Sequence, residues 1–168
     1  MMTRNRAWVY KVNSHRPGKL TGWHFDQYFS YRGSKPQPMG GDGWIRSPQS
    51  WARLRQVRRG DLFLCYQSDE RKIYGFARAA SGGYESLPKS GRFNCVDFMP
   101  RGLRLDAPVN ISRPEHRAVF AHVRAFTVPS RGTIHALASD ELRAILRLIS
   151  RANPRQAKMI QGLGLVIS

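Results

Sequence analysis

Two apolar runs separated by a short polar segment constrain the fold of this chain more than any other feature. Residues 61–67 (DLFLCYQ) and 73–80 (IYGFARAA) are rich in apolar and aromatic side chains, whereas residues 68–72 (SDERK) between them are polar. Runs of this length joined by a short loop predict a β-hairpin. Gly75 inside the second run indicates a bulge or a close approach of another backbone segment.

Other parts of the chain predict further strands and two longer helices. One helix begins at the N-cap Ser47 and ends near Arg58, and the last helix follows the cap Ser139 and ends before Pro154. Apolar residues recur at helical spacing in the last helix, at positions 142, 145, 146 and 149. Strands are expected at residues 8–13, 92–98, 103–105, 109–111 and 133–137, and a short helix at residues 115–120.

Short strands mixed with a few helices indicate an α+β fold with a curled or closed sheet. The 168 residues suit a single domain, residues 1–168. Within it, residues 14–43 form a long insertion that is rich in Gly, Pro and aromatic residues, which predicts an ordered loop with a helical turn at Asp26–Phe29. The tail from about residue 153 is basic and then apolar, and we expect an edge strand or a segment that contacts a partner.

The charge of the chain points to a polyanionic partner. Lys and Arg number 28 against 11 Asp and Glu, which gives a net charge of +17. Such a field supplies sequence-independent affinity for nucleic acid. The surface cations expected to hold phosphates are Arg16, Lys19, Arg32, Lys35, Arg53 and Arg58.

A membrane partner is disfavoured by the hydropathy pattern. No apolar stretch approaches the roughly 20 residues of a membrane span, and every amphipathic helix is better used as core. The basic residues near the N-terminus are followed by no apolar signal-peptide region. We therefore expect a cytoplasmic protein, with a monomer favoured.

Motifs for catalysis and for metal binding are missing from the sequence. The two cysteines, Cys65 and Cys95, form no Cys-x-x-Cys pair, and the five histidines lack zinc-site spacing. There is no phosphate-binding Walker loop and no Gly-x-Ser-x-Gly elbow, and the pair Asp69–Glu70 lies in a predicted turn. We expect no catalytic residue, no metal and no cofactor.

The four tryptophans instead suggest base stacking inside a basic surface. Trp8, on a predicted strand, and Trp51, on a helix face, are more simply explained as core. Trp44 stands between a glycine-rich loop and a helix N-terminus. It is either a pocket wall or a core residue.

Several segments resemble, in their order and spacing, the EVE domain family of the PUA-like superfamily, which is related to YTH domains. The Gly-Asp before an apolar strand and the Ile-x-Gly after the hairpin are the most specific of these segments. The resemblance covers roughly residues 7–149 and rests on WVYKVN (8–13), WIRSP (44–48), RGDL (59–62), CYQS (65–68), IYGFA (73–77) and LASDEL (137–142).

This resemblance implies a PUA-like curled β-barrel flanked by a few short helices, with a pocket for one nucleobase, often a modified one. Carried over by position, Trp44 is a wall of the pocket. The family's further wall is expected near residues 93–98, where Phe93 and Phe98 stand but no tryptophan, and Phe93 and Asp97 of this segment are implied pocket residues. The aromatic insertion could supply that wall, act as a lid, or be a core patch. The other pocket residues implied are Lys11, Asn13, Arg46, Ser47, Tyr66, Gln67 and Ser68.

The functional prediction is therefore a non-catalytic domain that binds DNA or RNA carrying a modified base. The first alternative is a nuclease or base-processing enzyme on the same scaffold, for which only Asp97 and His24 are candidate residues beside the pocket. The second alternative is an adaptor that binds protein through its apolar tail.

Overall fold

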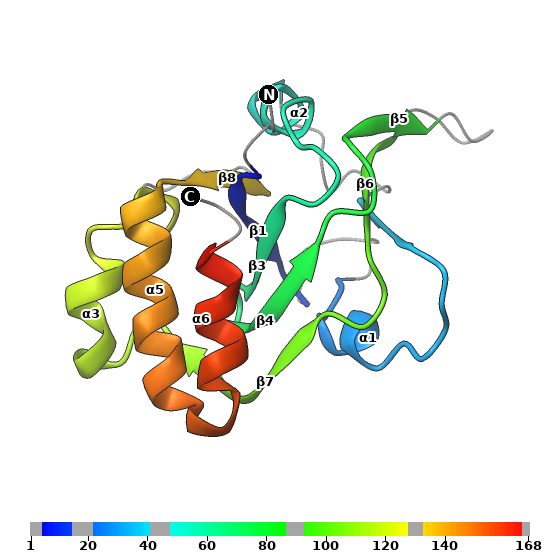
Figure 1. The fold of residues 1–168 in the computed structure, drawn as a ribbon. Coiled ribbons are helices and arrows are strands. Elements are labelled where there is room, and N and C mark those ends of the chain that lie inside the picture. Colours follow the sequence, from blue (N-terminus) through cyan, green and yellow to red (C-terminus); the bar gives the residue numbers. More distant parts are fainter. Residues whose placement is uncertain (1–4, 15–21, 41–47, 87–92, 128–132, 166–168) are drawn as a thin grey trace.

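A five-stranded sheet forms the centre of the molecule (Figure 1). The structure is a computed structural model that describes residues 5–14, 22–40, 48–86, 93–127 and 133–165. The large sheet has the order β7-β4-β3-β1-β8, and a three-stranded sheet has the order β2-β6-β5. The strands are β1 (Ala7–Val12), β2 (Gln37–Gly40), β3 (Leu62–Gln67), β4 (Lys72–Arg78), β5 (Tyr84–Ser86), β6 (Phe93–Phe98), β7 (Leu103–Asn110) and β8 (Ile134–Leu137).

The predicted hairpin is confirmed as β3 and β4, which pair antiparallel with Leu64 opposite Phe76. The pairing of β4 with β7 shifts register between Ile73 and Gly75. A Cβ atom on Gly75 would lie 2.2 Å from the carbonyl oxygen of Leu103, so only glycine fits there. The expected close backbone approach at this position is therefore confirmed.

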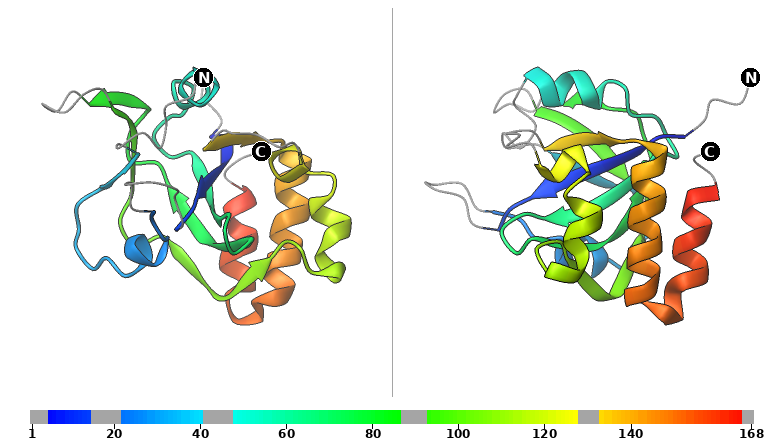
Figure 2. Two further views of the ribbon diagram at one scale, coloured as in Figure 1. Left: turned by 180° about the vertical axis from the view of Figure 1, so that it is seen from behind. Right: turned by 90° about the vertical axis from the view of Figure 1, so that its left-hand side faces the viewer.

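Two hydrophobic cores lie on opposite faces of the large sheet. Figure 2 shows the arrangement of the helices and strands around this sheet from two further sides. Successive strand residues alternate between the two cores: Val9 and Leu64 face helices α3, α5 and α6, whereas Trp8 and Phe63 face α1 and the small sheet. Because both faces are covered, β3 is buried along its whole length. The helices are α1 (Asp26–Phe29), α2 (Pro48–Leu54), α3 (Pro114–Phe120), α4 (Arg124–Thr127), α5 (Ser139–Ala152) and α6 (Ala157–Leu165).

Asp61 explains why a Gly-Asp pair precedes β3. Its carboxylate is only 1% exposed. It accepts hydrogen bonds from the backbone N–H of Arg6 at 2.9 Å, the indole N–H of Trp8 at 2.9 Å and the backbone N–H of Arg58 at 3.0 Å. One side chain thus joins the start of β1 to the start of β3, which pair in parallel. Gly60 before it has a φ of 91°, a conformation that favours glycine.

The edge strand expected in the C-terminal tail is wrong, because the tail forms a 3₁₀ turn (Pro154–Gln156) and the helix α6. Contact of the tail with a partner stays a prediction. The apolar residues Ile160 and Leu163 follow helical spacing and pack on the core beside α5. Asn153 and Gln156 cover the outer edge of β7: their side chains bond the backbone of Ala107 and of Asp106. The tail therefore covers the outer edge of the sheet and does not add a strand to it.

Smaller differences concern helix and strand bounds. Ser139 is the first residue of α5 and not its cap; the Glu141 carboxylate accepts the backbone N–H of Ala138, the N-cap, at 2.8 Å. The two strands expected at 103–105 and 109–111 are one strand, β7. The helical turn at Asp26–Phe29 is confirmed as α1, while the expected cap Ser47 lies outside the described residues.

The α+β class is confirmed, and a bridge between Ala79 and Phe98 joins the two sheets. Closure of the strands into a barrel stays a prediction. Within the described ranges, no helix is long and apolar enough to span a membrane.

Candidate nucleic-acid interface

A basic cleft opens beside β8, one of the two edge strands of the large sheet. Its volume is about 520 Å³. Its walls come from α2, α4, β8 and the start of α5, elements that are far apart in the sequence. The cleft is lined by Arg53, Arg124, Ala125, His135, Ala136, Leu137, Ala138 and Glu141.

Arg53 is fixed in this cleft by β8. Its Nη1 atom donates to the carbonyl oxygen of Ile134 at 2.9 Å and approaches Nδ1 of His135 at 3.1 Å. Because a guanidinium can only donate, Nδ1 is the acceptor and the imidazole proton resides on Nε2. The positive charge of the residues that line the cleft comes from Arg53 and Arg124.

Lys11 adds a cation next to Arg53. Burial lowers the pKa of its ammonium group, and the charge of Arg53 lowers that pKa further. The Lys11 Nζ atom lies 6.0 Å from the centre of the Phe126 ring, within cation–π range. Lys11 and Arg53 repel each other electrostatically, and a bound anion would reduce this repulsion.

Glu141 is the carboxylate among the residues that line the cleft. One of its oxygens accepts the backbone N–H of Arg124 at 3.3 Å, and the other accepts that of Ala138. Both carboxylate oxygens of Glu141 therefore accept hydrogen bonds at helix N-termini, where a negative charge is favourable. The cleft is therefore suited to an anionic ligand.

Tyr66 and Phe126 place aromatic surface under Lys11. Their rings meet edge to face with centroids 4.9 Å apart. Tyr66 is buried in the core beneath the helices, and burial raises the pKa of its hydroxyl group. Phe126, at the end of α4, is only partly buried.

Of the predicted pocket residues, Gln67 holds the aromatic insertion against the sheet and Ser68 bonds the end of β1. Gln67 is 0% exposed. Its amide donates to Ser14 Oγ at 2.8 Å and to the Trp23 carbonyl at 3.1 Å, and its oxygen accepts the Phe25 N–H at 3.2 Å. The Ser68 hydroxyl donates to the Val12 carbonyl at 2.9 Å. The two side chains therefore position the end of β1 and the segment that follows it, where Asn13 is half-buried.

Asp97 and His24, the candidates for an enzyme, are occupied in separate structural contacts. Asp97 accepts the Tyr84 hydroxyl at 2.6 Å; burial and then this bond raise the pKa of the Tyr84 hydroxyl. His24 donates from Nε2 to Glu70 at 2.7 Å and accepts the Asp26 N–H at Nδ1 over 3.0 Å. Both ring nitrogens of His24 are thus engaged in hydrogen bonds to Glu70 and Asp26.

A metal site is not formed by the part of the chain that the structure describes, which holds no suitable group of three or more His, Cys, Asp or Glu side chains. Both Cys65 and Cys95 are buried.

The remaining predicted residues divide into two groups. Arg32, Lys35 and Arg58 are exposed and lie outside the residues lining the cleft. The placement of Trp44, Arg46, Ser47, Arg16 and Lys19, and of the side chain of Phe93, lies outside what the structure describes.

Sequence reasoning missed Arg124, Phe126 and His135. His135 lies in a correctly predicted strand, but a lone histidine there gives no signal of a cleft. Arg124 and Phe126 belong to α4, a short helix that no periodicity announced. Their role emerges only when α4 packs beside β8.

Comparison of the fold with solved structures identifies similar domains. Human THYN1 in complex with 5-methylcytosine-containing DNA has a TM-score of 0.66 at 16% identity, covering 86% of this chain and 98% of that one. The DUF55 domain of human thymocyte nuclear protein 1 has a TM-score of 0.65 at 18% identity, with coverage of 85% and 98%. This chain has the fold of these domains.

A YTH domain shares the fold more distantly. That of Zygosaccharomyces rouxii MRB1, in complex with N6-methyladenosine RNA, has a TM-score of 0.50 at 17% identity, covering 86% of this chain and 84% of that one. The resemblance to EVE and YTH domains is thus confirmed at the level of the fold. No protein-family model and no curated protein sequence matches the chain.

Proposed function

We propose that this chain is a non-catalytic reader of a modified nucleobase in DNA or RNA, and that the nucleic acid lies along the basic cleft. The observation that carries the proposal is the presence of Arg53 and Arg124 in a cleft whose carboxylate is already bonded to backbone N–H groups, with the charge of Lys11 close to Arg53. The similar domains from human and yeast, crystallised with 5-methylcytosine DNA and N6-methyladenosine RNA, support it.

In this proposal the arginines hold phosphates and an adjoining pocket holds the base. Phosphate contacts position a nucleic acid, whereas contacts to the base select it. Lys11, Asn13 and Tyr66 border the pocket from the sheet, with Trp44, Arg46 and Ser47 as the expected further wall. We also propose that the chain is a single domain whose strands close into a PUA-like barrel. Surface cations such as Lys35 and Arg58 add long-range electrostatic attraction for the nucleic acid.

The proposal is tested with fluorescent oligonucleotides that carry 5-methylcytosine, N6-methyladenine or no modification, as DNA and as RNA, at one salt concentration with Mg²⁺ present. We expect one modified oligonucleotide to bind more tightly than its unmodified twin and to stay intact. Equal affinity for every twin would refute base reading, and cleavage or base conversion would favour the enzyme.

The variant Trp44→Ala distinguishes base binding in the pocket from general electrostatic attraction to nucleic acid. Stacking on one aromatic side chain contributes about 1–3 kcal/mol per base, so affinity for the preferred oligonucleotide should fall roughly tenfold or more. The variant should melt at the parent temperature. If it melts far lower and binds all ligands worse in proportion, Trp44 is a core residue.

A further inference from the structure

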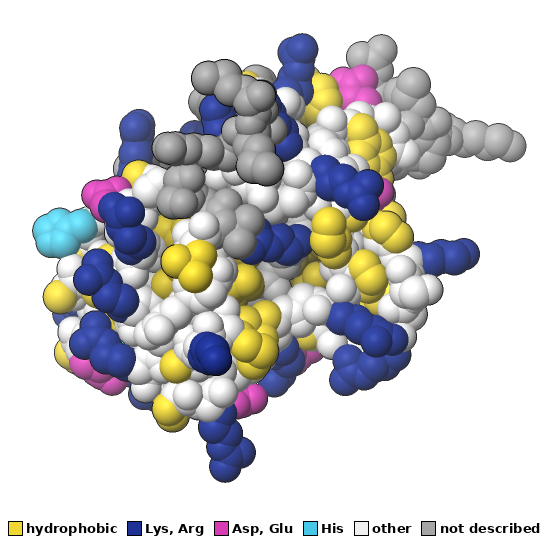
Figure 3. Space-filling view, viewed as in Figure 1, with side chains coloured by type: hydrophobic (Ala, Val, Ile, Leu, Met, Phe, Trp, Pro, Cys, Tyr) yellow, Lys and Arg dark blue, Asp and Glu magenta, His cyan; other side chains and the backbone are white. Residues whose placement is uncertain are grey.

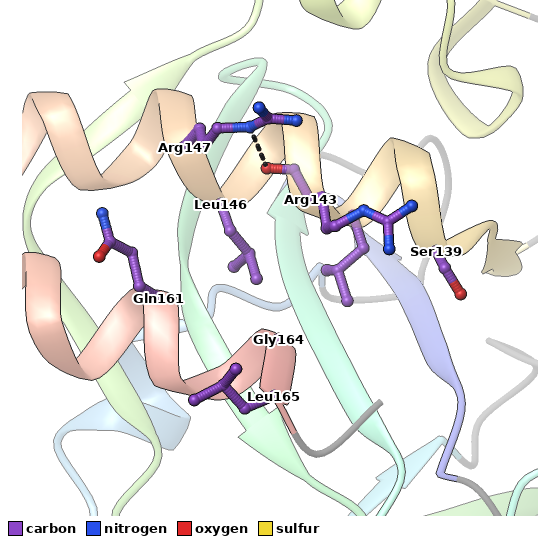
Figure 4. Close-up of a pocket in the computed structure, with 8 residues that line it drawn as sticks. Ser139, Arg143, Leu146, Arg147, Gln161, Gly164 and Leu165 are labelled. Atoms are coloured by element: carbon purple, nitrogen blue, oxygen red, sulfur yellow. Dashed lines mark hydrogen bonds between the residues drawn. The ribbon is translucent and has the colours of Figure 1, made fainter. Parts of the chain in front are cut away.

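An apolar groove runs between α5 and α6, on the helical face of the molecule. Its volume is about 610 Å³, within the range of ligand sites in proteins. Figure 4 shows Leu146 on α5 and Leu165 on α6 facing the space between the two helices. The lining consists of Ser139, Leu142, Arg143, Leu146, Arg147, Gln161, Gly164 and Leu165, none of which lines the basic cleft.

The floor of this groove is aliphatic and one of its walls is unusually exposed. Leu165 is 81% exposed and, with Met159 at 56%, forms the set of large exposed hydrophobics among the described residues; both belong to α6. At Gly164 the two helices approach closely, since a Cβ atom there would lie 3.1 Å from Leu146 Cδ1. Such apolar surface beside polar residues is typical of an interaction site.

The rim of the groove along α5 is cationic. Arg143 and Arg147 are exposed and stand one helical turn apart, and Arg151 continues the row. The guanidinium groups of Arg147 and Arg151 bond to backbone carbonyls one turn earlier, at 3.4 Å each. No carboxylate belongs to the described lining. Figure 3 shows this face, with hydrophobic side chains between Lys and Arg side chains.

We propose that the α5–α6 groove docks an amphipathic helical segment of a partner protein, with aliphatic residues on its buried face and Asp or Glu along one flank. Two neighbouring helices present a groove into which a third helix can lay residues i, i+3, i+4 and i+7. The acidic flank would pair with Arg143 and Arg147, because guanidinium groups bind carboxylates in two-pronged fashion.

Other occupants fit this surface less well. Bases bind by stacking on aromatic rings, whereas the floor here is made of leucines. A second copy would bring its own arginine row toward this one, and a chain with a net charge of +17 repels itself. An acidic amphipathic helix would place aliphatic side chains on the floor of the groove and carboxylates beside the arginines of its rim.

The test is selection of binders from a displayed library of 16-residue peptides against the full chain, followed by affinity measurement with the enriched peptides. We expect enriched sequences to combine leucine-like residues at helical spacing with Asp or Glu on one flank. Leu165→Ser should weaken their binding by about tenfold or more. Arg147→Glu should weaken it by a similar factor, whereas Arg117→Glu, an exposed site on α3, should change it by less than about twofold.

Several results would overturn the proposal. The first is that the library yields no enriched peptide of this kind, and the second is that the enriched peptides are acidic but not amphipathic. The third is an equal loss of peptide affinity for Arg117→Glu and Arg147→Glu, because equal losses would indicate that net charge alone drives binding. Concentration-dependent dimerisation abolished by Leu165→Ser would assign the groove to a second copy. Tighter binding to anionic phosphatidylserine vesicles than to any peptide, lost in the same variant, would assign it to a lipid surface. Melting temperatures of all variants exclude unfolding as the cause.

Discussion

Single buried polar side chains fix how distant segments of this chain meet. Asp61 joins the starts of β1 and β3, and Gln67 joins the end of β3 to the segment that follows β1. Both side chains satisfy backbone or indole N–H groups that would otherwise be buried without acceptors. Such contacts are costly to break, because an unpaired buried donor retains its full desolvation penalty.

Asp61→Ala should therefore be strongly destabilising. It leaves three donors, from Arg6, Trp8 and Arg58, without their acceptor. At about 1–3 kcal/mol per unpaired group, the free energy of unfolding should fall by roughly 3 kcal/mol or more. Urea titration measures this loss, with the exposed Asp106→Ala as the matched control. A loss below about 1 kcal/mol would show that the clamp is dispensable.

Glu70 should make stability depend on pH in the acid range. Burial raises the pKa of its carboxyl group, but hydrogen bonds from Tyr74 and His24 outweigh burial and lower that pKa below its ordinary value of 4.5. A carboxyl whose pKa is lowered by folding stabilises the folded state above its unfolded pKa, and this contribution disappears as the pH falls through the folded pKa.

Melting temperatures of the parent and of Glu70→Gln, measured from neutral pH to about pH 3, test this linkage. The parent should be the more stable at neutral pH, and the difference should close in acid. The exposed Glu85→Gln provides the control and should follow the parent throughout. A difference in melting temperature between the parent and Glu70→Gln that stays constant with pH would contradict this linkage.

At the scale of elements, the sequence predicted most of what is local and little of what is long-range. The hairpin β3–β4, the helix α5 and the strands β1, β6 and β8 follow from periodicity and turn residues. The parallel pairing of β1 with β3 and the packing of α4 beside β8 join segments far apart in the chain, and no local pattern encodes them. The basic cleft depends on the packing of α4 beside β8, so of its two arginines only Arg53 was predicted.

The helix α6 was mistaken for a strand because Gly162 and Gly164 interrupt its apolar residues, and glycine is a poor helix former. Their surroundings differ. A Cβ atom on Gly162 would meet nothing within 4 Å, whereas one on Gly164 would lie 3.1 Å from Leu146.

Gly162→Ala should accordingly stabilise the protein by about 0.5–1 kcal/mol, since alanine loses less backbone entropy on folding and has room for its methyl group. Gly164→Ala should gain less or lose stability, because its methyl group presses on α5. Thermal unfolding of the two variants gives the comparison. Equal effects would contradict the packing of α6 on α5.

For the whole molecule, the net charge indicates the kind of ligand and the basic cleft a candidate place for it. The net charge of +17 attracts any polyanion, but it cannot say where the ligand binds. The cleft lined by Arg53, Arg124 and His135 supplies a candidate location. The sequence resemblance anticipated the fold shared with THYN1, while the pocket wall around Trp44 stays a prediction.

The salt dependence of binding to one duplex oligonucleotide, measured for the parent, Arg124→Gln and Arg117→Gln, tests the central claim most directly. Each phosphate contact contributes about 0.9 to the slope of log affinity against log salt concentration. Arg124→Gln should reduce the slope by roughly that amount, and Arg117→Gln, on the exposed face of α3, should leave it unchanged. Equal slopes for the two variants would contradict a nucleic-acid interface in the basic cleft.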